Sequence, residues 1–474
     1  MLAVIISWFF LALLAIRLVQ HLYSVWKSPN RSVPGPWLAR YTRLWYFYRV
    51  YSGNFHHENI QLHNHYHSRV VRVAPNMYSI SQPDKAVYGI GVNVRKSDWY
   101  DGWKHPSPDR WSLFPERNIK RHAETRRKFQ NIYSLSSLVS YEKYVDDCGD
   151  IFTERLVEIA ASGQDIDLGY WLRCYAFDVI GQITYSKRFG FLDAGEDVGG
   201  LIKAINKVVL YGSLVGIYVG LHPITFKIME YLPGSGASAR MYLTRFVRER
   251  VAQREAERDQ SHPNAAKKQP PRSGSSMPED FLNKIFGLYE DGTKGVTKYH
   301  VFMMGQSNIV AGSDTTAVSL SSILYHLLKN PKSMQTLRAE IAELGQHDGS
   351  GTGHITFRQT QEMRYLQAVI KEGLRLHPVT GLPLWREVPE TGAYICGRQF
   401  RAGDVVGINS WVAHYDESVW GSDVHLFRPE RWLEADQATL RKMESHYMPV
   451  SAPRCLRNRC NEALADATIS SGGM

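Results

Sequence analysis

A short polar segment interrupts a long apolar stretch in the middle of the chain, at AGSDTT, residues 311–316. The glycine would allow close packing against a neighbouring helix. The hydroxyls, by bonding to the preceding turn, could instead open a helix and free groups that hold a water or a bound oxygen species. The residues alone leave both interpretations open, close helix packing and a functional kink.

A second set of reactive side chains lies further along the chain. Glu372 and Arg375 are three positions apart on a predicted helix and therefore share one face. Such a pair is usually a weak surface salt bridge. In FRPERW, residues 427–432, Arg431 stands beside an aromatic residue and a proline in a non-helical setting. The order of the three motifs along the chain is more informative than any one of them.

Five histidines lie close together near the amino end, at His56, His57, His63, His65 and His67. Imidazole is the commonest protein ligand for transition metals. A dedicated metal site would need a fixed i, i+4 pair with a carboxylate or thiolate, whereas this run is interleaved with Asn and Gln. We interpret it as a solvated surface helix.

The composition limits the classes of protein to consider. With 474 residues, 44% of them hydrophobic and 22% charged, the chain can bury a large core and is too apolar for overall disorder. Its formal charge of +10 comes without a basic stripe or a nucleic-acid reading element, which argues against nucleic acid as a partner. A membrane surface or an acidic protein fits the charge better, and solubility alone is the alternative.

The chain begins with a candidate membrane anchor. Residues 1–16 carry no charged side chain, and apolar character continues to Trp26, which is long enough to span a bilayer. Because no basic region precedes this stretch and no small-residue cleavage site follows it, residues 1–26 are predicted to be an uncleaved transmembrane helix rather than a signal peptide. Basic residues directly after it place the rest of the chain in the cytosol. Residues 27–40, with a Pro-Gly-Pro turn, form a hinge.

The remainder is predicted to be mainly α with small β-sheets. Apolar residues at three- and four-residue spacing predict amphipathic helices over residues 141–160, 172–186 and 241–258, and a long helix is expected over 298–329. Alternation over residues 69–78 indicates a strand next to a turn, and residues 394–408 indicate two short strands. Residues 259–279, rich in Pro, Ser and Lys, are predicted to form a flexible loop.

Taken in order, these motifs resemble those of the cytochrome P450 family, the heme-thiolate monooxygenases. AGSDTT is similar to the family's oxygen-activation helix, Glu372 and Arg375 to its Glu-x-x-Arg pair, and Arg431 to the arginine that joins this pair in a buried triad. The resemblance implies the cytochrome P450 fold, with a catalytic domain over residues 41–449. The residues of these motifs are most similar to those of fungal microsomal members of the family that oxidise small aromatic or secondary-metabolite substrates.

The resemblance also implies roles for individual residues. Asp314 and Thr315 would relay protons to bound oxygen, which requires an acid and a hydroxyl within one hydrogen bond or one water of it. Thr316 is better explained by helix packing. His122 and Arg126 would contact one heme propionate and Arg386 the other, a task that suits arginine because its planar fork pairs with a carboxylate in two places.

The reaction implied by the family is reductive activation of O2 at heme iron. One oxygen atom would enter a small organic substrate and the other would leave as water, while an axial thiolate favours O–O cleavage. Electrons would come from NADPH through NADPH–cytochrome P450 reductase at the endoplasmic reticulum membrane. A basic face could dock this acidic partner.

The family's heme loop is altered here. Its glycines are missing from YMPVSAPRCLRNRC, residues 447–460, although glycines would allow the backbone to approach the ligand sulfur. Cys455, beside Arg454, is the better candidate for the axial iron ligand, and Cys460 is the alternative. The other cysteines are Cys148, Cys174 and Cys396, and the five together fit neither a disulfide framework nor a four-cysteine zinc site.

Residues 450–474 are therefore expected to be an atypical segment in place of the usual heme-cysteine loop. One hypothesis is that a frame or splice disruption near residue 450 replaced the original carboxyl terminus. The other is a divergent but working loop in which Cys455 binds iron. The chain is accordingly predicted to be a monooxygenase, and the alternative is a heme-deficient, truncated and non-catalytic relative.

Overall fold

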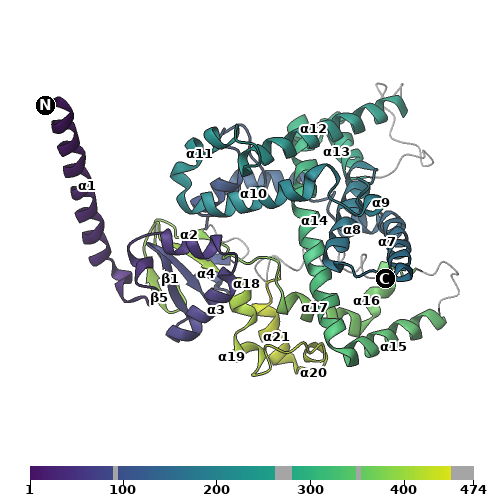
Figure 1. The fold of residues 1–474 in the computed structure, drawn as a ribbon. Helices are drawn as coiled ribbons and strands as arrows, with labels where there is room; N and C mark the ends of the chain where they lie inside the picture. Colours follow the sequence, from purple (N-terminus) through teal and green to yellow (C-terminus); the bar gives the residue numbers. More distant parts are fainter. Residues whose placement is uncertain (89–93, 262–279, 348–353, 450–474) are drawn as a thin grey trace.

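A computed structural model describes residues 1–88, 94–261, 280–347 and 354–449. Within these residues the protein is mainly helical with two small sheets, which confirms the predicted fold class (Figure 1). Most of the predicted loop over 259–279 lies outside the described residues. The atypical segment 450–474, which contains Cys455 and Cys460, also lies outside them.

The helices form several groups along the chain. Those of the amino-terminal third are α1 (Leu2–Trp26), α2 (Leu44–Tyr51), α3 (Phe55–Tyr66), α4 (Lys85–Tyr88), α5 (Ile119–Phe129), α6 (Leu135–Val139) and α7 (Glu142–Ser162). Those of the middle are α8 (Leu168–Tyr185), α9 (Phe191–Ala194), α10 (Leu201–Val215), α11 (His222–Met229), α12 (Gly236–Ser261), α13 (Phe281–Glu290) and α14 (Lys298–Lys329). Those of the carboxyl-terminal part are α15 (Pro331–His347), α16 (Phe357–Glu362), α17 (Arg364–Leu376), α18 (Ser410–His414), α19 (Glu417–Trp420), α20 (Arg431–Glu434) and α21 (Gln437–His446).

The larger sheet has the strand order β1-β2-β6-β3 and joins the two ends of the chain. It is built from β1 (Val70–Ala74), β2 (Met77–Ile80), β3 (Arg386–Glu387) and β6 (Val405–Ile408), while β4 (Ala393–Ile395) and β5 (Arg398–Phe400) pair separately. The strand predicted near residues 69–78 is in fact a hairpin, because Asn76 takes a left-handed φ of 57° and turns the chain back. The two strands expected over 394–408 are likewise three strands in two sheets.

Helix α14 runs through the middle of the body, as Figure 1 shows, with α7 to α9 on one side and the sheet on the other. It crosses α8 and α17 closely, and glycine makes both crossings possible. A Cβ atom on Gly312 would lie 2.7 Å from Cδ1 of Ile180 in α8, and one on Gly373 would lie 2.6 Å from Cγ1 of Ile323. Helix α14 is continuous over its predicted range, and Gly312 of the AGSDTT segment is a close-packing position.

The predicted histidine-rich helix is present as α3, but the prediction that it is solvated is wrong in part. His63 is buried, its Nε2 lies 3.0 Å from Oγ of Ser79 and its Nδ1 lies 2.8 Å from the carbonyl oxygen of Ser68. The ring of His56 lies 4.3 Å from that of Trp411, whereas His57, His65 and His67 are exposed. Among the described residues no cluster of His, Cys, Asp and Glu suited to a metal ion is present.

Two stretches of the described chain are long and apolar enough to cross a bilayer, Ile5–Trp26 and Val198–Met229. The first belongs to α1, which projects from the body in Figure 1 and is not covered by it. The second is partly buried in the body and is interrupted at Tyr218, whose backbone is not helical. The helix α1 is therefore the better candidate for a membrane span.

Candidate functional site

The centre of the site is a buried carboxylate, Glu372. Its residue lies on α17, whose apolar face packs into the core, and both Glu372 and Arg375 are fully buried. Arg375 donates two parallel hydrogen bonds to this carboxylate, from Nη2 to Oε1 at 2.8 Å and from Nε to Oε2 at 2.9 Å. The pair is thus a bidentate buried ion pair, the geometry in which an arginine holds a carboxylate most firmly.

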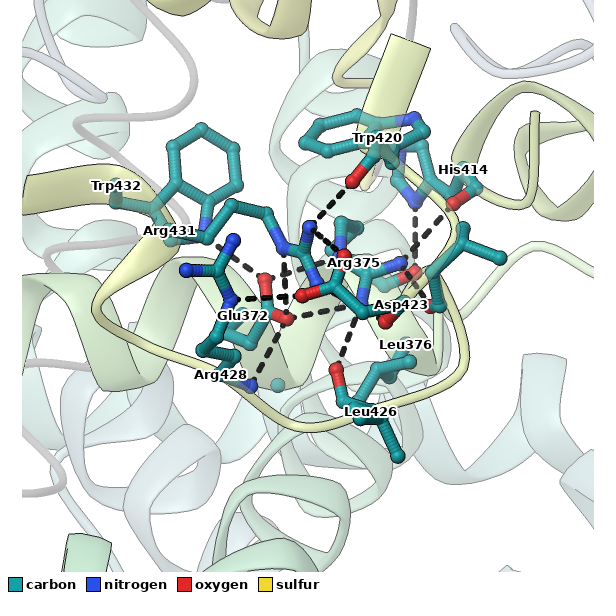
Figure 2. Close-up of polar contacts among 12 residues, drawn as sticks. Glu372, Arg375, Leu376, His414, Trp420, Asp423, Leu426, Arg428, Arg431 and Trp432 are labelled. Carbon is teal, nitrogen blue, oxygen red and sulfur yellow. Dashed lines mark hydrogen bonds and ion pairs between the residues drawn. The ribbon is translucent and has the colours of Figure 1, made fainter. Parts of the chain in front are cut away.

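Residues from the carboxyl-terminal part complete the coordination of Glu372 (Figure 2). Arg431 Nε lies 3.3 Å from Oε1, and the indole N–H of Trp432 donates to Oε2 at 3.0 Å. The backbone N–H of Arg428 also donates to Oε1, at 3.2 Å. The structure therefore brings the predicted residues Glu372, Arg375 and Arg431 together, although 56 residues or more separate the last from the first two. Trp432 was not predicted from the sequence as a member of this network.

A second carboxylate balances the second arginine. Asp423 Oδ1 accepts a hydrogen bond from Arg431 Nη1 at 2.7 Å and also faces Arg428. Burial favours the neutral carboxyl, but the hydrogen bond and charge of Arg431 and the charge of Arg428 outweigh it and lower the pKa of Asp423. Two guanidinium groups in the core thus face two carboxylates, Glu372 and Asp423, which is the condition for burying them without a large penalty.

The network continues through Arg375 into the backbone. Its Nη1 donates to the carbonyl oxygens of His414 at 3.1 Å and Val424 at 2.8 Å, and its Nη2 donates to that of Leu426 at 3.2 Å (Figure 2). Because His414 ends α18 and Val424 and Leu426 lie in an irregular segment, these carbonyls are not paired within a helix or a sheet and need such donors. Arg375 therefore fixes the course of the chain between α18 and α20.

His414 extends the network to the last described residues. Its Nδ1 lies 2.9 Å from the carbonyl oxygen of Arg375, and its Nε2 lies 2.6 Å from the backbone nitrogen of Met448. The only tautomer that fits carries the proton on Nδ1, since Nε2 must accept from the Met448 N–H. Burial lowers the pKa of His414 to about 3 and keeps it neutral. The residues directly before the segment 450–474 are therefore tied to Glu372 and Arg375. His414 was not predicted from the sequence as a site residue.

On α14 the structure places Asp314 and Thr315 in different surroundings. The Thr315 hydroxyl donates to the carbonyl oxygen of Ala311 at 2.7 Å, and Thr315 lies on an exposed face in the middle of this central helix. Asp314 is in an ion pair with Arg173 of α8, at 2.8 Å from Nη2 and 3.0 Å from Nε. Arg173 also donates to Asn206 of α10 at 2.8 Å. Thr316 lies beside Ile180 in a small apolar cavity between α8 and α14, as a packing role requires.

The three predicted propionate contacts come from two elements. His122 and Arg126 lie one turn apart on α5, and both are half-buried. Arg386 lies on β3, where its Nη1 donates to the Tyr100 hydroxyl at 3.2 Å and to the carbonyl oxygen of Trp385 at 3.0 Å. Its guanidinium carbon also lies 5.3 Å from the ring centre of Tyr88. The contacts of Tyr88 and Tyr100 with Arg386 could not be predicted from the sequence, because both tyrosines are far from Arg386 along the chain.

The described cysteines are free thiols, of which Cys148 and Cys174 are buried and Cys396 is half-buried. Burial raises the pKa of Cys148 and Cys174 to about 12 and that of Cys396 to about 11. A thiol of this kind stays protonated at neutral pH. Cys455 and Cys460, the two cysteines predicted as candidates for the axial ligand, lie outside the described residues.

The helical fold, the buried network around Glu372 and Arg375 and the exposed face of α14 are the features that the sequence motifs predicted. The model of the family "Cytochrome P450" matches residues 47–453, which is most of the chain, and the chain belongs to this family. It is 36% identical over 429 residues to a pisatin demethylase of Fusarium vanettenii, and the match covers 90% of this chain and 79% of the relative.

Other relatives are also fungal. The chain is 34% identical over 432 residues to a cytochrome P450 monooxygenase of Aspergillus terreus, covering 89% of this chain and 84% of the relative. It is 32% identical over 438 residues to one of Aspergillus flavus, covering 90% and 82%. These matches confirm both the family and the fungal placement that the motifs suggested.

Proposed function

We propose that the chain is a membrane-anchored heme-thiolate monooxygenase that hydroxylates or otherwise oxidises a small organic, secondary-metabolite-like substrate. The observation that carries the proposal is the buried network of Glu372, Arg375 and Arg431, which fixes the segment leading to Met448. Burying two arginines with two carboxylates costs desolvation free energy, more than holding a surface loop requires. We therefore propose that the network serves to position the chain that follows it accurately.

The described residues fit the heme that the family implies. His122, Arg126 and Arg386 would hold its two carboxylates, and Ala311 offers a small side chain on the open face of α14. Cys455, or Cys460 as the alternative, would provide the thiolate. When bound, heme supplies a redox-active iron at which O2 is activated.

The protein's own contribution to the reaction is proton transfer and positioning. We assign the Thr315 hydroxyl, on the open face of α14, as the last donor of a relay, which requires it to turn away from the Ala311 carbonyl. Asp314 is adjacent in sequence, and its ion pair with Arg173 fixes the carboxylate that would accept and pass on a proton. The relay therefore depends on how firmly Arg173 holds Asp314.

Electrons would come from NADPH through NADPH–cytochrome P450 reductase. Helix α5 carries the basic residues Lys120, Arg121, Arg127 and Lys128 beside the proposed propionate contacts, and the whole chain has a formal charge of +10. A basic surface attracts an acidic partner and sets its orientation before contact. This places the proposed docking surface close to the proposed heme site.

Anchoring in the endoplasmic reticulum membrane, with the catalytic domain in the cytosol, is supported by α1 and by an apolar surface on the body. Leu221, Ile224 and Ile228, at and near α11, have exposed fractions of 54, 62 and 67%. Apolar side chains of this size rarely face water in a group. We expect α1 to span the bilayer and α11 to rest on it.

The absence of glycine from residues 447–460 favours a second candidate function, a heme-deficient and non-catalytic relative. The experiment that separates the two is oxygen-isotope labelling in microsomes that hold the chain, its reductase, NADPH and a panel of small aromatic metabolites. A monooxygenase puts one atom of 18O2 into a product and the other into water. If no substrate gains 18O while a related fungal enzyme does so in the same membranes, the non-catalytic interpretation is correct.

A further inference from the structure

A small cavity lies between α7, α8 and α14 and shares no lining residue with the network around Glu372. Its volume is about 40 Å³. A single water needs about 10–15 Å³, whereas sites for drug-sized organic molecules measure about 300–1,000 Å³. The cavity is therefore large enough for a molecule of two or three atoms and too small for an organic substrate.

The wall of this cavity is mostly hydrocarbon. Seven of its ten lining residues are aliphatic residues or glycine, among them Ala176, Val179 and Ile180 of α8, and the others are Thr316 and two tyrosines. A buried water makes about three hydrogen bonds, which a mostly hydrocarbon wall does not favour. A cavity of this kind prefers a small apolar molecule to water.

Gly312 keeps the cavity free on its α14 side. A Cβ atom at this position would lie 2.7 Å from Cδ1 of Ile180, which is another residue of the wall. A larger residue in place of Gly312 would therefore fill this space or force the wall to move.

The cavity opens beside the exposed face of α14. Eight of its ten lining residues are buried, and the two half-buried ones are Gly312 and Thr316. Each directly follows an exposed residue of the open face, Ala311 and Thr315 respectively. Because consecutive residues of an α-helix lie about 100° apart around its axis, the mouth of the cavity is next to the face that we assign to oxygen chemistry.

The geometry points to a binding site for dioxygen in this cavity, from which O2 passes to the open face of α14. O2 is diatomic and apolar, so it matches the cavity in size and chemistry and gains dispersion contacts with the wall. The inference rests on the proposed function and deepens it, because it gives the gaseous substrate a binding site of its own on the protein.

Methyl NMR can test this site with O2 itself, because O2 is paramagnetic and speeds the relaxation of nuclei close to it. The full chain in detergent, labelled at its isoleucine δ1 methyl groups, is compared under O2 and under N2 at equal pressure and without reductant, so that any heme iron contributes equally to both spectra. Ile180 and Ile183 line the cavity, whereas Ile370 of α17 is fully buried and does not. We expect the O2-dependent increase in relaxation rate to be several-fold larger for Ile180 and Ile183 than for Ile370.

Three variants make the test specific for the cavity. Ala176→Val adds two carbon atoms to the wall and should abolish the difference between Ile180 and Ile370, whereas Val179→Ala removes two and should keep or increase it. Ala160→Val makes the first change on the exposed surface of α7 and should give the wild-type result. The methyl spectra also show whether each variant is folded. Equal O2-dependent relaxation of Ile180 and Ile370 in the wild type overturns the inference and leaves the proposed function intact.

In the active enzyme, filling the cavity should change the response to O2 alone. Ala176→Val is expected to raise the O2 concentration for half-maximal turnover several-fold and to leave that of the organic substrate unchanged. An unchanged O2 dependence would overturn the passage of O2 from the cavity to α14. A wild type that shows the O2 contact but oxidises no substrate contradicts the proposed function instead, so the two failures are distinguishable.

Discussion

At the scale of single residues, the buried carboxylate of Glu372 holds the network of the site together. Four donors from α17, the segment before α20 and α20 itself converge on it, namely Arg375, Arg431, Trp432 and the N–H of Arg428. Removing one partner of a buried pair leaves the other charge unpaired in the core. Substituting any one member of the network should therefore cost more stability than its own hydrogen bonds contribute.

Replacing Arg375 by alanine should therefore destabilise the protein by about 3–5 kcal/mol and prevent retention of heme. Guanidinium-chloride unfolding and heme content after gel filtration are the measurements. Arg364→Ala on the same helix is the control, since Arg364 is exposed and should cost little. Full heme content in the Arg375→Ala protein would contradict the role that we give this network.

Thr315→Ala is expected to uncouple oxygen consumption from product formation in the active enzyme, because the donor on the open face of α14 is lost. The measurement is the ratio of product formed to NADPH oxidised, which should fall several-fold while NADPH is still consumed. Thr316→Ala is the comparison, since Thr316 lines the apolar cavity against α8 and should keep the wild-type ratio. Normal coupling in Thr315→Ala would remove Thr315 from the relay.

At the scale of elements, α14 is held by close crossings with α8 and α17. Sequence periodicity was sufficient to predict α14 with both of its ends and to predict α7, α8 and α12 within a few residues, because these helices are long and carry apolar residues at three- and four-residue spacing. It was insufficient for the sheet, where β3 has only two residues and its partner is Val405–Val406. Strands of this length carry no periodic signal.

The crossing of α14 with α17 gives a prediction with a built-in control. Gly373→Ala would place a Cβ 2.6 Å from Cγ1 and 3.3 Å from Cα of Ile323, so we expect a loss of about 1–3 kcal/mol through overpacking. Gly287→Ala in α13 meets no atom within 4 Å and should instead stabilise by about 1 kcal/mol through helix propensity. Urea unfolding of both variants measures the difference. Equal effects of the same sign would show that the crossing is looser than described.

In the candidate site, Glu372, Arg375 and Arg431 could be predicted from their sequence motifs, whereas their neighbours Asp423 and His414 could not. Asp423 and His414 carry no local signal, since an isolated aspartate or histidine in a short helix or loop is usually on the surface. Their importance arises from the tertiary fold, which places Asp423 beside Arg431 and His414 between Arg375 and Met448. The same holds for Tyr100, which contacts Arg386 although 286 residues separate the two along the chain.

At the scale of the whole molecule, buried neutral histidines make stability depend on pH. Burial lowers the pKa of His414 to about 3 and that of His63 to about 4, from an ordinary value of 6.5. Below pH 6.5 the unfolded chain takes up these protons and the folded chain does not, so the free energy of unfolding falls as the pH drops from 6.5 toward 4. Each such histidine contributes a slope of up to about 1.4 kcal/mol per pH unit.

Unfolding measured from about pH 7.5 to about 4.5 checks this expectation. His414→Gln should show a smaller decrease of stability across the range than the wild type, although its stability at the upper end of the range is lower. His65→Gln, which changes an exposed residue of α3, should reproduce the slope of the wild type. A His414→Gln profile parallel to the wild type would mean that His414 is protonated as readily in the folded protein as in the unfolded one.

The central claim is that this chain holds a heme through a cysteine thiolate, and the ferrous carbon-monoxide difference spectrum tests it most directly. The chain would be expressed with heme precursor, beside Cys455→Ser and Cys460→Ser variants. We predict the absorption band of thiolate-ligated heme in the wild type and in Cys460→Ser, and its loss in Cys455→Ser. The absence of this band from all three proteins would contradict the claim and identify the chain as a heme-deficient relative.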